Sequence, residues 1–198
     1  MKILLLKLCV FSLTGCMLRI TACHDLEFVS REEWGAREPK HIETMATPVP
    51  HLFIHHTAMG ECFHFESCCK MMQTIQNFHM DDRGWDDIGY NFLIGGDGKV
   101  YVGRGWNRVG AHTYGYNRNA VALSLMGDFS NKEPSSVMLN TTKSLIHHAM
   151  SENYVMENFK LHGHRDAGPT ECPGTALYNI IKQWPHFQGG PLANYRRV

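Results

Sequence analysis

The stretch IGYNFLIGGDGKVYVGR, residues 88–104, is the part of the sequence that most clearly indicates the fold. Residues 88–94 are mostly apolar, and apolar residues recur through 99–104. Between them stands Gly95-Gly-Asp-Gly, a run of residue types that favour a tight turn. The pattern therefore predicts a β-hairpin in which residues 88–94 and 99–104 form the two strands.

On both sides of this hairpin, strand-like and helix-like segments alternate. Short apolar runs that predict strands cover residues 51–57, 120–126 and 159–163. Apolar spacing that predicts helices covers residues 69–80, 137–150 and 175–184. Because strands and helices interleave around one hairpin, we expect an α/β fold, a single domain with a mixed central β-sheet flanked by α-helices.

Composition limits the function classes. A chain of 198 residues can form one ordinary domain with a real core. Lys+Arg and Asp+Glu are both 19, and this balance argues against a nucleic-acid-binding protein, which would carry a basic surface. The hydrophobic fraction of 43% excludes an intrinsically disordered chain. The thirteen histidines and seven cysteines point to metal binding, disulfides or both.

The amino-terminal residues 1–22 have the layout of a signal peptide. Met1-Lys2 is a positive start, an apolar run follows over residues 3–18, and small residues come at Thr21-Ala22. The alternative is a membrane anchor, but the run is shorter than the roughly 20 residues that a spanning helix needs. We expect a secreted protein without a membrane span. Residues 27–188 would form the domain, and residues 189–198 a flexible C-terminal tail.

Secretion changes the interpretation of the cysteines. Removal of the signal peptide leaves an odd number of them in an oxidising compartment, namely Cys23, Cys62, Cys68, Cys69 and Cys172. Cys62 and Cys68 bracket a short loop and could form a small disulfide. Cys69 could pair with Cys23. That assignment would leave Cys172 unpaired.

Candidate chemistry lies at the ends of predicted strands. His55 and His56 close the strand at 51–57, His164 follows the strand at 159–163, and Cys172 stands in the next loop. Two imidazoles and one thiolate are good zinc ligands, and three protein ligands leave a fourth position open for water, as in catalytic sites. Spacing alone leaves a second interpretation open, in which the histidines are structural and Cys172 is a small buried side chain.

Nine segments together carry a family resemblance. They are Val29-Ser-Arg-Glu-Glu-Trp-Gly-Ala, Ile54-His-His-Thr-Ala, Phe78-His-Met, Asp87-Ile-Gly-Tyr-Asn-Phe-Leu-Ile-Gly, Gly103-Arg-Gly-Trp, Gly110-Ala-His-Thr, Gly163-His-Arg-Asp, Cys172-Pro-Gly and Trp184-Pro-His-Phe. In this order they resemble the peptidoglycan recognition proteins, the animal relatives of the phage-lysozyme type of zinc amidase. That family has a mixed central sheet with helices packed on it.

The resemblance implies a zinc-dependent N-acetylmuramoyl-L-alanine amidase of innate immunity, with one Zn²⁺ per chain. The implied zinc ligands are His55, His164 and Cys172, and the implied catalytic residues are Tyr90, in the hairpin strand, and Thr170. The reaction would hydrolyse the amide between the lactyl group of N-acetylmuramic acid and L-alanine. The alternative is a non-catalytic muropeptide receptor, but recognition-only members typically lose a ligand that this chain keeps.

The resemblance also implies a partner, bacterial peptidoglycan and its muropeptides. Gly84-Trp85 and Arg104 match members that select meso-diaminopimelate, whose extra carboxylate an arginine can bind. A preference for lysine-type peptidoglycan is the alternative. His56, His79 and Arg83 match further positions that contact the muropeptide.

Two covalent features complete the expectations, while the oligomeric state stays open. The family's small disulfide matches Cys62 and Cys68. Asn140-Thr-Thr is an N-glycosylation sequon on the predicted helix at 137–150, so its use depends on how exposed Asn140 is.

Overall fold

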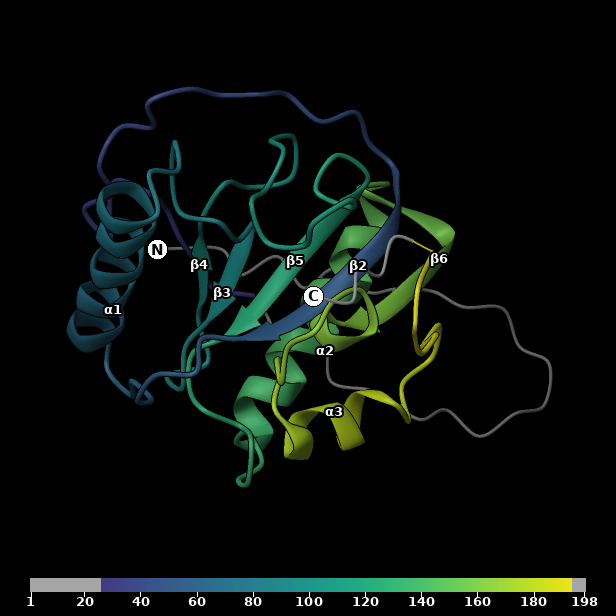
Figure 1. Cartoon of the computed structure of the whole chain (residues 1–198). Helices are drawn as coiled ribbons and strands as arrows, with labels where there is room; N and C mark the ends of the chain where they lie inside the picture. The colour runs from purple at the N-terminus through teal and green to yellow at the C-terminus, as the bar shows by residue number, and fades with distance from the viewer. Residues whose placement is uncertain (1–25, 194–198) are drawn as a thin grey trace, which may run out of the picture.

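A computed structural model describes residues 26–193 of the chain (Figure 1). The strands are β1 (Phe28–Val29), β2 (Val49–His56), β3 (Phe92–Ile94), β4 (Val100–Val102), β5 (Ala120–Leu125) and β6 (Val155–Gly163). The helices are α1 (Phe65–Asn77), α2 (Ser136–Ser151) and α3 (Thr175–Ile181). Two shorter turns follow α1 and β6, a π-helical turn η1 (Phe78–Asp82) and a 3-10 turn η2 (His164–Asp166).

Within the described residues, the strands form one six-stranded sheet in the order β1-β4-β3-β5-β2-β6. The predicted hairpin is the antiparallel pair β3 and β4, and every other pairing in this sheet is parallel. The expected mixed sheet in an α/β domain is therefore confirmed.

Helices cover both faces of the sheet (Figure 1). Because side chains alternate along a strand, Leu93 of β3 faces α1, while Phe92 and Ile94 face the opposite side. The core on the opposite side joins β2 to α2 and α3 through Leu52, Ile54, Met138, Leu145, Leu177 and Ile181. Each fully buried Leu or Ile stabilises the fold by roughly 1.5–3 kcal/mol. The strand that carries the candidate histidines, β2, is thus packed against α2 and α3 on one face of the sheet.

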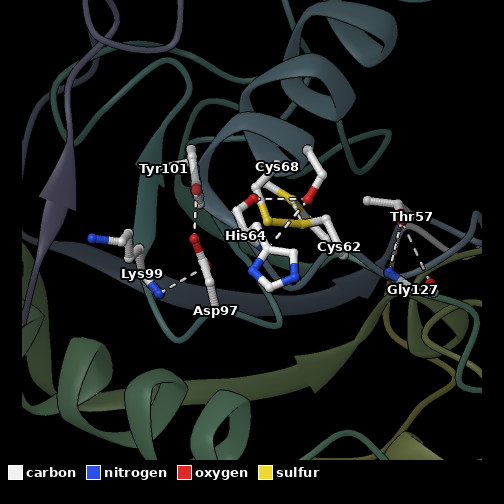
Figure 2. The surroundings of a disulfide bond; sticks show 10 residues. Thr57, Cys62, His64, Cys68, Asp97, Lys99, Tyr101 and Gly127 are labelled. Atoms are coloured by element: carbon white, nitrogen blue, oxygen red, sulfur yellow. Dashed lines mark hydrogen bonds between the residues drawn. A yellow bond between two sulfur atoms is a disulfide. The ribbon is translucent and has the colours of Figure 1, made fainter.

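The loop before α1 is closed by the expected disulfide between Cys62 and Cys68, with sulfurs 2.01 Å apart. Figure 2 shows this bond beside the hairpin turn, where the Tyr101 hydroxyl donates to Asp97 at 2.7 Å. The disulfide thus fixes the start of α1 near the β3–β4 hairpin. Cys69 is a buried free thiol among the described residues, and Cys23, its suggested partner, lies outside them.

Several element boundaries differ from the prediction. The segment Ile88–Asn91 is not strand, so Tyr90 precedes β3 instead of lying in it. The cause is Asn91, whose buried amide donates to the carbonyls of Gly105 and Arg108 and accepts from Ala122 N–H. The backbone carbonyls of Tyr90 and Asn91 still accept from the N–H groups of Arg104 and Gly103, each at 3.0 Å, so the side-chain bonds add to backbone pairing here.

The helices and the last strand also shift. The first helix begins at Phe65 instead of residue 69, and β6 begins four residues before Phe159. Helix α2 begins at Ser136 because the Ser135 hydroxyl caps it by accepting from Met138 N–H at 3.3 Å.

The structure describes the two ends of the chain only in part. The predicted signal peptide, residues 1–22, lies outside the described residues. The start of the tail expected to be flexible is held in place, because Gly190 N–H and Leu192 N–H donate to Asp166, each at 2.8 Å. No helix within residues 26–193 is both long and apolar enough to cross a membrane.

Candidate metal centre and groove

Parallel strands bring the three candidate ligands together. Ile54 of β2 is paired with Gly163 of β6, so His55 and His164 follow at the same edge of the sheet. Cys172, in the loop between η2 and α3, lies against this edge, where the His56 N–H donates to its Sγ at 3.4 Å. The ligand atoms of His55, His164 and Cys172 all lie within 4.8 Å of one another.

The geometry of this cluster fits zinc. The distance between Cys172 Sγ and His55 Nδ1 is 3.6 Å. Tetrahedral zinc, with bonds of about 2.3 Å to sulfur and 2.0–2.1 Å to nitrogen, holds such ligand atoms roughly 3.5 Å apart. Two imidazoles and one thiol are also the donor types that zinc prefers.

Burial keeps all three side chains neutral in the absence of a metal. It lowers the pKa of His55 well below its ordinary value and that of His164 to about 4, so both rings keep a free lone pair at neutral pH. It raises the pKa of the Cys172 thiol to about 12, so this group must release a proton when a metal binds.

The predicted catalytic residues flank the cluster. The Tyr90 ring lies 5.3 Å from the His55 ring, centroid to centroid. Burial strongly raises the pKa of the Tyr90 phenol, which therefore stays protonated and can donate a hydrogen bond. The Thr170 hydroxyl accepts from the Cys172 N–H at 3.2 Å, so Thr170 acts on the loop that presents the thiol.

A groove of about 540 Å³ opens above the cluster. Its lining comes from the edge of the sheet, from α1 with η1, and from the loops before β3 and β5. The lining residues are His55, Thr57, Met59, Thr74, Ile75, Phe78, His79, Arg83, Trp85, Tyr90, Ala111, His112 and His164. Two ligands and the Tyr90 ring thus form part of one open wall that a substrate can reach.

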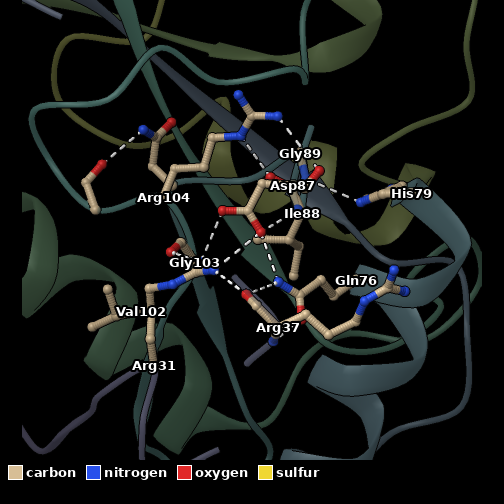
Figure 3. Close-up of polar contacts among 12 residues, drawn as sticks. Arg31, Arg37, Gln76, His79, Asp87, Ile88, Gly89, Val102, Gly103 and Arg104 are labelled. Atoms are coloured by element: carbon tan, nitrogen blue, oxygen red, sulfur yellow. Dashed lines mark hydrogen bonds and ion pairs between the residues drawn. The ribbon is translucent and has the colours of Figure 1, made fainter. Parts of the chain in front are cut away.

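His79 is held in one orientation in this wall. Its Nδ1 accepts from the Gly89 N–H at 3.0 Å (Figure 3), and the Trp85 ring packs against it at 4.6 Å. Burial lowers the pKa of His79 to about 4, so the ring is neutral at pH 7 and carries its proton on Nε2. The bond from Gly89 gives this buried histidine a polar partner at a position on the inner side of η1.

Gly84 and Arg104 belong to a second, adjoining pocket of about 320 Å³. This pocket shares Trp85 and Ala111 with the groove. The Arg104 guanidinium donates to the carbonyl of Ile88 (Figure 3) and to that of Val109, each at 2.7 Å, and so ties together the two loops that border the pocket. Gly84 has φ +70°, which a glycine adopts without strain.

Among the predicted substrate-binding residues, all of which lie in the described part of the chain, only His56 lines neither the groove nor the second pocket. Successive strand residues face opposite sides, so its side chain points away from that of His55. Its Nδ1 accepts from the Phe129 N–H at 3.2 Å and lies 3.8 Å from Asp128 Oδ1. The structure therefore places its backbone beside Cys172 and its side chain outside the groove.

Asn140 lies on the exposed side of α2. The sequon threonine, Thr142, is fully buried and donates to the Met138 carbonyl at 2.7 Å. The acceptor amide is therefore on the surface, while the residue that completes the sequon is held inside the helix.

Sequence reasoning missed residues that line or support the groove. Ile75 and Thr74 of α1 line it, as do Met59 and Ala111. Asp87 supports it from behind, because its buried carboxylate accepts from Gln76 of α1 at 2.7 Å and pairs with Arg31 at 3.0 Å (Figure 3). The partners of a buried Asp produce no periodic pattern in the sequence, so periodicity could not have predicted this role.

Comparisons with known proteins identify the family of this chain. The family model described as N-acetylmuramoyl-L-alanine amidase matches residues 45–175. Peptidoglycan-recognition protein LB of Drosophila melanogaster is 45% identical over 160 residues, which are 80% of this chain and 69% of the relative.

Two solved structures share the fold. A mutant of Drosophila PGRP-LB in complex with tracheal cytotoxin matches with a TM-score of 0.80 and 44% identity, over 81% of this chain and 96% of that one. Peptidoglycan recognition protein-LE in complex with tracheal cytotoxin, a monomeric diaminopimelic acid-type peptidoglycan, matches with a TM-score of 0.81 and 36% identity, over 82% of this chain and 96% of that one. This chain therefore belongs to the peptidoglycan recognition proteins and contains their N-acetylmuramoyl-L-alanine amidase domain.

Proposed function

We propose that this protein is a zinc-dependent N-acetylmuramoyl-L-alanine amidase that binds bacterial peptidoglycan and acts in innate immunity. One observation carries the proposal. His55, His164 and Cys172 lie within 4.8 Å of one another beneath an open groove, with the Tyr90 ring beside them. A receptor that only binds its ligand needs no such cluster.

The three ligands would hold one Zn²⁺ and leave one coordination position open. Bound there, zinc supplies Lewis acidity and a nucleophilic water at neutral pH. The chain's own residues do the remaining work. The protonated Tyr90 phenol donates to the oxyanion that develops on the attacked amide carbonyl. Thr170 holds the Cys172 loop through its hydroxyl. The groove wall orients the muropeptide, with the His79 Nε2–H as a fixed donor.

The preferred substrate is peptidoglycan of the meso-diaminopimelate type. Support comes from the tracheal cytotoxin complexes of the two relatives and from the second pocket beside Trp85. Arg104 brings a positive charge to that pocket, and burial lowers its pKa without removing the charge at neutral pH. A guanidinium can pair with the extra carboxylate of diaminopimelate, which lysine lacks.

The remaining proposals concern secretion, the extent of the domain and glycosylation. Residues 1–22 act as a signal peptide, the enzyme is secreted, and the functional domain spans residues 27–188. Its exposed position supports N-glycosylation of Asn140. The relatives' family supports an extracellular role, since peptidoglycan is met outside the cell.

A turnover assay tests the proposal. The purified protein is incubated with diaminopimelate-type and lysine-type muropeptides, with and without a chelator, and then with added zinc. We expect release of free stem peptide that is lost on chelation, restored by zinc and faster for the diaminopimelate type. Binding of muropeptide by the zinc-loaded protein without any release would overturn the amidase and support the receptor.

A further inference from the structure

A threonine hydroxyl lies directly behind the candidate zinc ligand His55. We propose that Thr113 is a positioning residue that fixes the tautomer and ring orientation of His55, so that His55 Nδ1 faces the metal position. This inference rests on the proposed zinc site. It concerns how the chain prepares that site before a metal arrives.

The contacts of Thr113 are short, and the residue is buried. Thr113 is 1% exposed, and its Oγ1 lies 3.3 Å from His55 Nε2 and 2.9 Å from His112 Nδ1. The hydroxyl therefore bridges two imidazole rings. Its backbone is fixed as well, because the N–H groups of Thr113 and His112 both donate to Asn117 Oδ1, at 2.8 and 2.9 Å.

The direction of the proton in each bond follows from the chemistry of the ligand. His55 Nδ1 faces Cys172 Sγ at 3.6 Å and is thus the nitrogen offered to a metal. A neutral imidazole that binds metal through Nδ1 carries its proton on Nε2. His55 Nε2–H must then donate to Thr113 Oγ1.

The proton of the Thr113 hydroxyl remains to be placed, and His112 accepts a hydrogen bond from it. Since Thr113 Oγ1 accepts from His55, its own O–H is free to donate to His112 Nδ1. The sequence of donors is therefore His55 Nε2–H to Thr113 Oγ1–H to His112 Nδ1. In this series His55 donates, Thr113 accepts and donates, and His112 accepts. The opposite tautomer of His55 would place its proton on the metal-binding nitrogen.

These three hydrogen-bonded side chains form a relay, and close packing surrounds the His112 ring at its end. A Cβ on Gly110 would lie 2.3 Å from His112 Cδ2 and 2.8 Å from its Nε2. Real side chains do not approach so closely, so only glycine at 110 leaves room for the ring. The absence of a side chain at position 110 thus provides the space in which the His112 ring lies beside the threonine hydroxyl.

The first test compares zinc affinities of the full chain by competition with a chelator. Thr113→Val keeps the shape of the side chain but removes the acceptor for His55 Nε2–H, and we expect zinc affinity to fall about 10–100-fold. Thr113→Ser keeps the hydroxyl and should stay within a few-fold of the original. The matched control is Thr141→Val, since Thr141 is also 1% exposed and donates to the Gly98 carbonyl at 2.9 Å, on α2.

The outcomes separate this inference from the proposed function. Loss of affinity in Thr113→Val alone, with rescue by Thr113→Ser, supports the relay. Equal zinc affinity in folded Thr113→Val and the original chain overturns it while leaving the amidase intact. If the original chain itself binds no zinc, the proposed function fails first.

A second measurement uses the unaltered chain and so does not depend on how Thr113→Val folds. The ¹⁵N chemical shifts of the His55 ring in the metal-free protein report which nitrogen carries the proton. We expect the proton on Nε2, already set before zinc is added. A proton on Nδ1, or an even mixture of both tautomers, would overturn the proposal.

Discussion

The metal centre and the second pocket, which contains Gly84, Trp85 and Arg104, are built in different ways. His55 and His164 stand at the ends of neighbouring parallel strands, so the pairing of β2 with β6 fixes their separation. Gly84, Trp85 and Arg104 stand instead on or beside loops, which side-chain bonds to backbone carbonyls hold together. The sheet thus positions two of the three ligands, and only Cys172 comes from a loop. The two regions adjoin at Trp85 and Ala111, which line both the groove and the second pocket.

Asp87 shows how the loop region gains its order. Its carboxylate accepts from the N–H of Ile88 at 2.8 Å and from Gln76 of α1, and it pairs with Arg31 (Figure 3). The segment that ends in Tyr90 is thus tied to α1 and to the chain that follows β1. Because different contacts hold the two regions, reaction chemistry and substrate preference should be separable by mutation.

The largest effect is expected at the metal centre. Cys172→Ser replaces the thiolate by a poor zinc ligand, so hydrolysis should fall by more than the roughly 100-fold that loss of an outer partner costs. Muropeptide binding should persist, because most of the groove lining is untouched. Turnover and binding by calorimetry check both. If binding is lost together with turnover in a folded variant, the two regions are not independent.

Tyr90→Phe should have the second largest effect. It removes one donor to the oxyanion and keeps the ring, so kcat should fall about 10²–10³-fold. KM and zinc content should change little, since Tyr90 is not a ligand. Steady-state kinetics and metal analysis of the same preparation check this. A kcat within a few-fold of the original would remove Tyr90 from the reaction.

Arg104→Gln addresses the loop region alone. The ratio of kcat/KM between diaminopimelate-type and lysine-type muropeptides should fall roughly 10-fold or more, the value of a charged hydrogen bond. Turnover of the lysine type should change much less. The control is Arg37→Gln, an exposed arginine paired with Asp81 at 2.6 Å and outside both pockets. An unchanged ratio in Arg104→Gln would assign the preference to other residues.

Much of the fold could be predicted because its signals are local. Apolar alternation and the Gly95-Gly-Asp-Gly turn predict the hairpin, and helical spacing predicts α2 and α3. The boundary error at Ile88–Asn91 has a non-local cause. The Asn91 side chain bonds to residues 105, 108 and 122, and no pattern around position 91 reports those partners.

The site could be predicted only through the resemblance. Spacing left zinc and structural histidines both open, because the ligands lie far apart in the sequence and only the parallel pairing of β2 and β6 brings them together. His56 shows the limit of transferring residues by motif, since its ring points to Asp128. Thr113 and Asp87 stood inside recognised segments, but their roles are defined by buried partners and not by spacing.

The smallest predicted effect is at His51, which lines neither the groove nor the second pocket. Its Nδ1 lies 3.0 Å from His162 Nε2, and His162 Nδ1 donates to the Gln188 carbonyl at 2.7 Å. His51 therefore donates to His162. Burial, together with the nearby His162 and Lys160, lowers the pKa of His51 to about 4, against about 6.5 in an unfolded chain.

The sign of the pH dependence follows from these values. As pH falls below about 6.5, the unfolded chain takes up a proton at His51 before the folded one does, so the free energy of unfolding falls until pH reaches about 4. His51→Gln removes this group and should make the decline shallower. The change in slope should correspond to less than ~1 proton taken up on unfolding, because the site is partly exposed. Urea unfolding of both metal-free proteins at pH 7, 6 and 5 measures the two slopes. Since His51 lies outside the groove and its neighbouring pocket, turnover should not change. Equal slopes would mean that His51 titrates normally, and a loss of turnover would mean that the sheet beneath His55 is less rigid than its pairing implies.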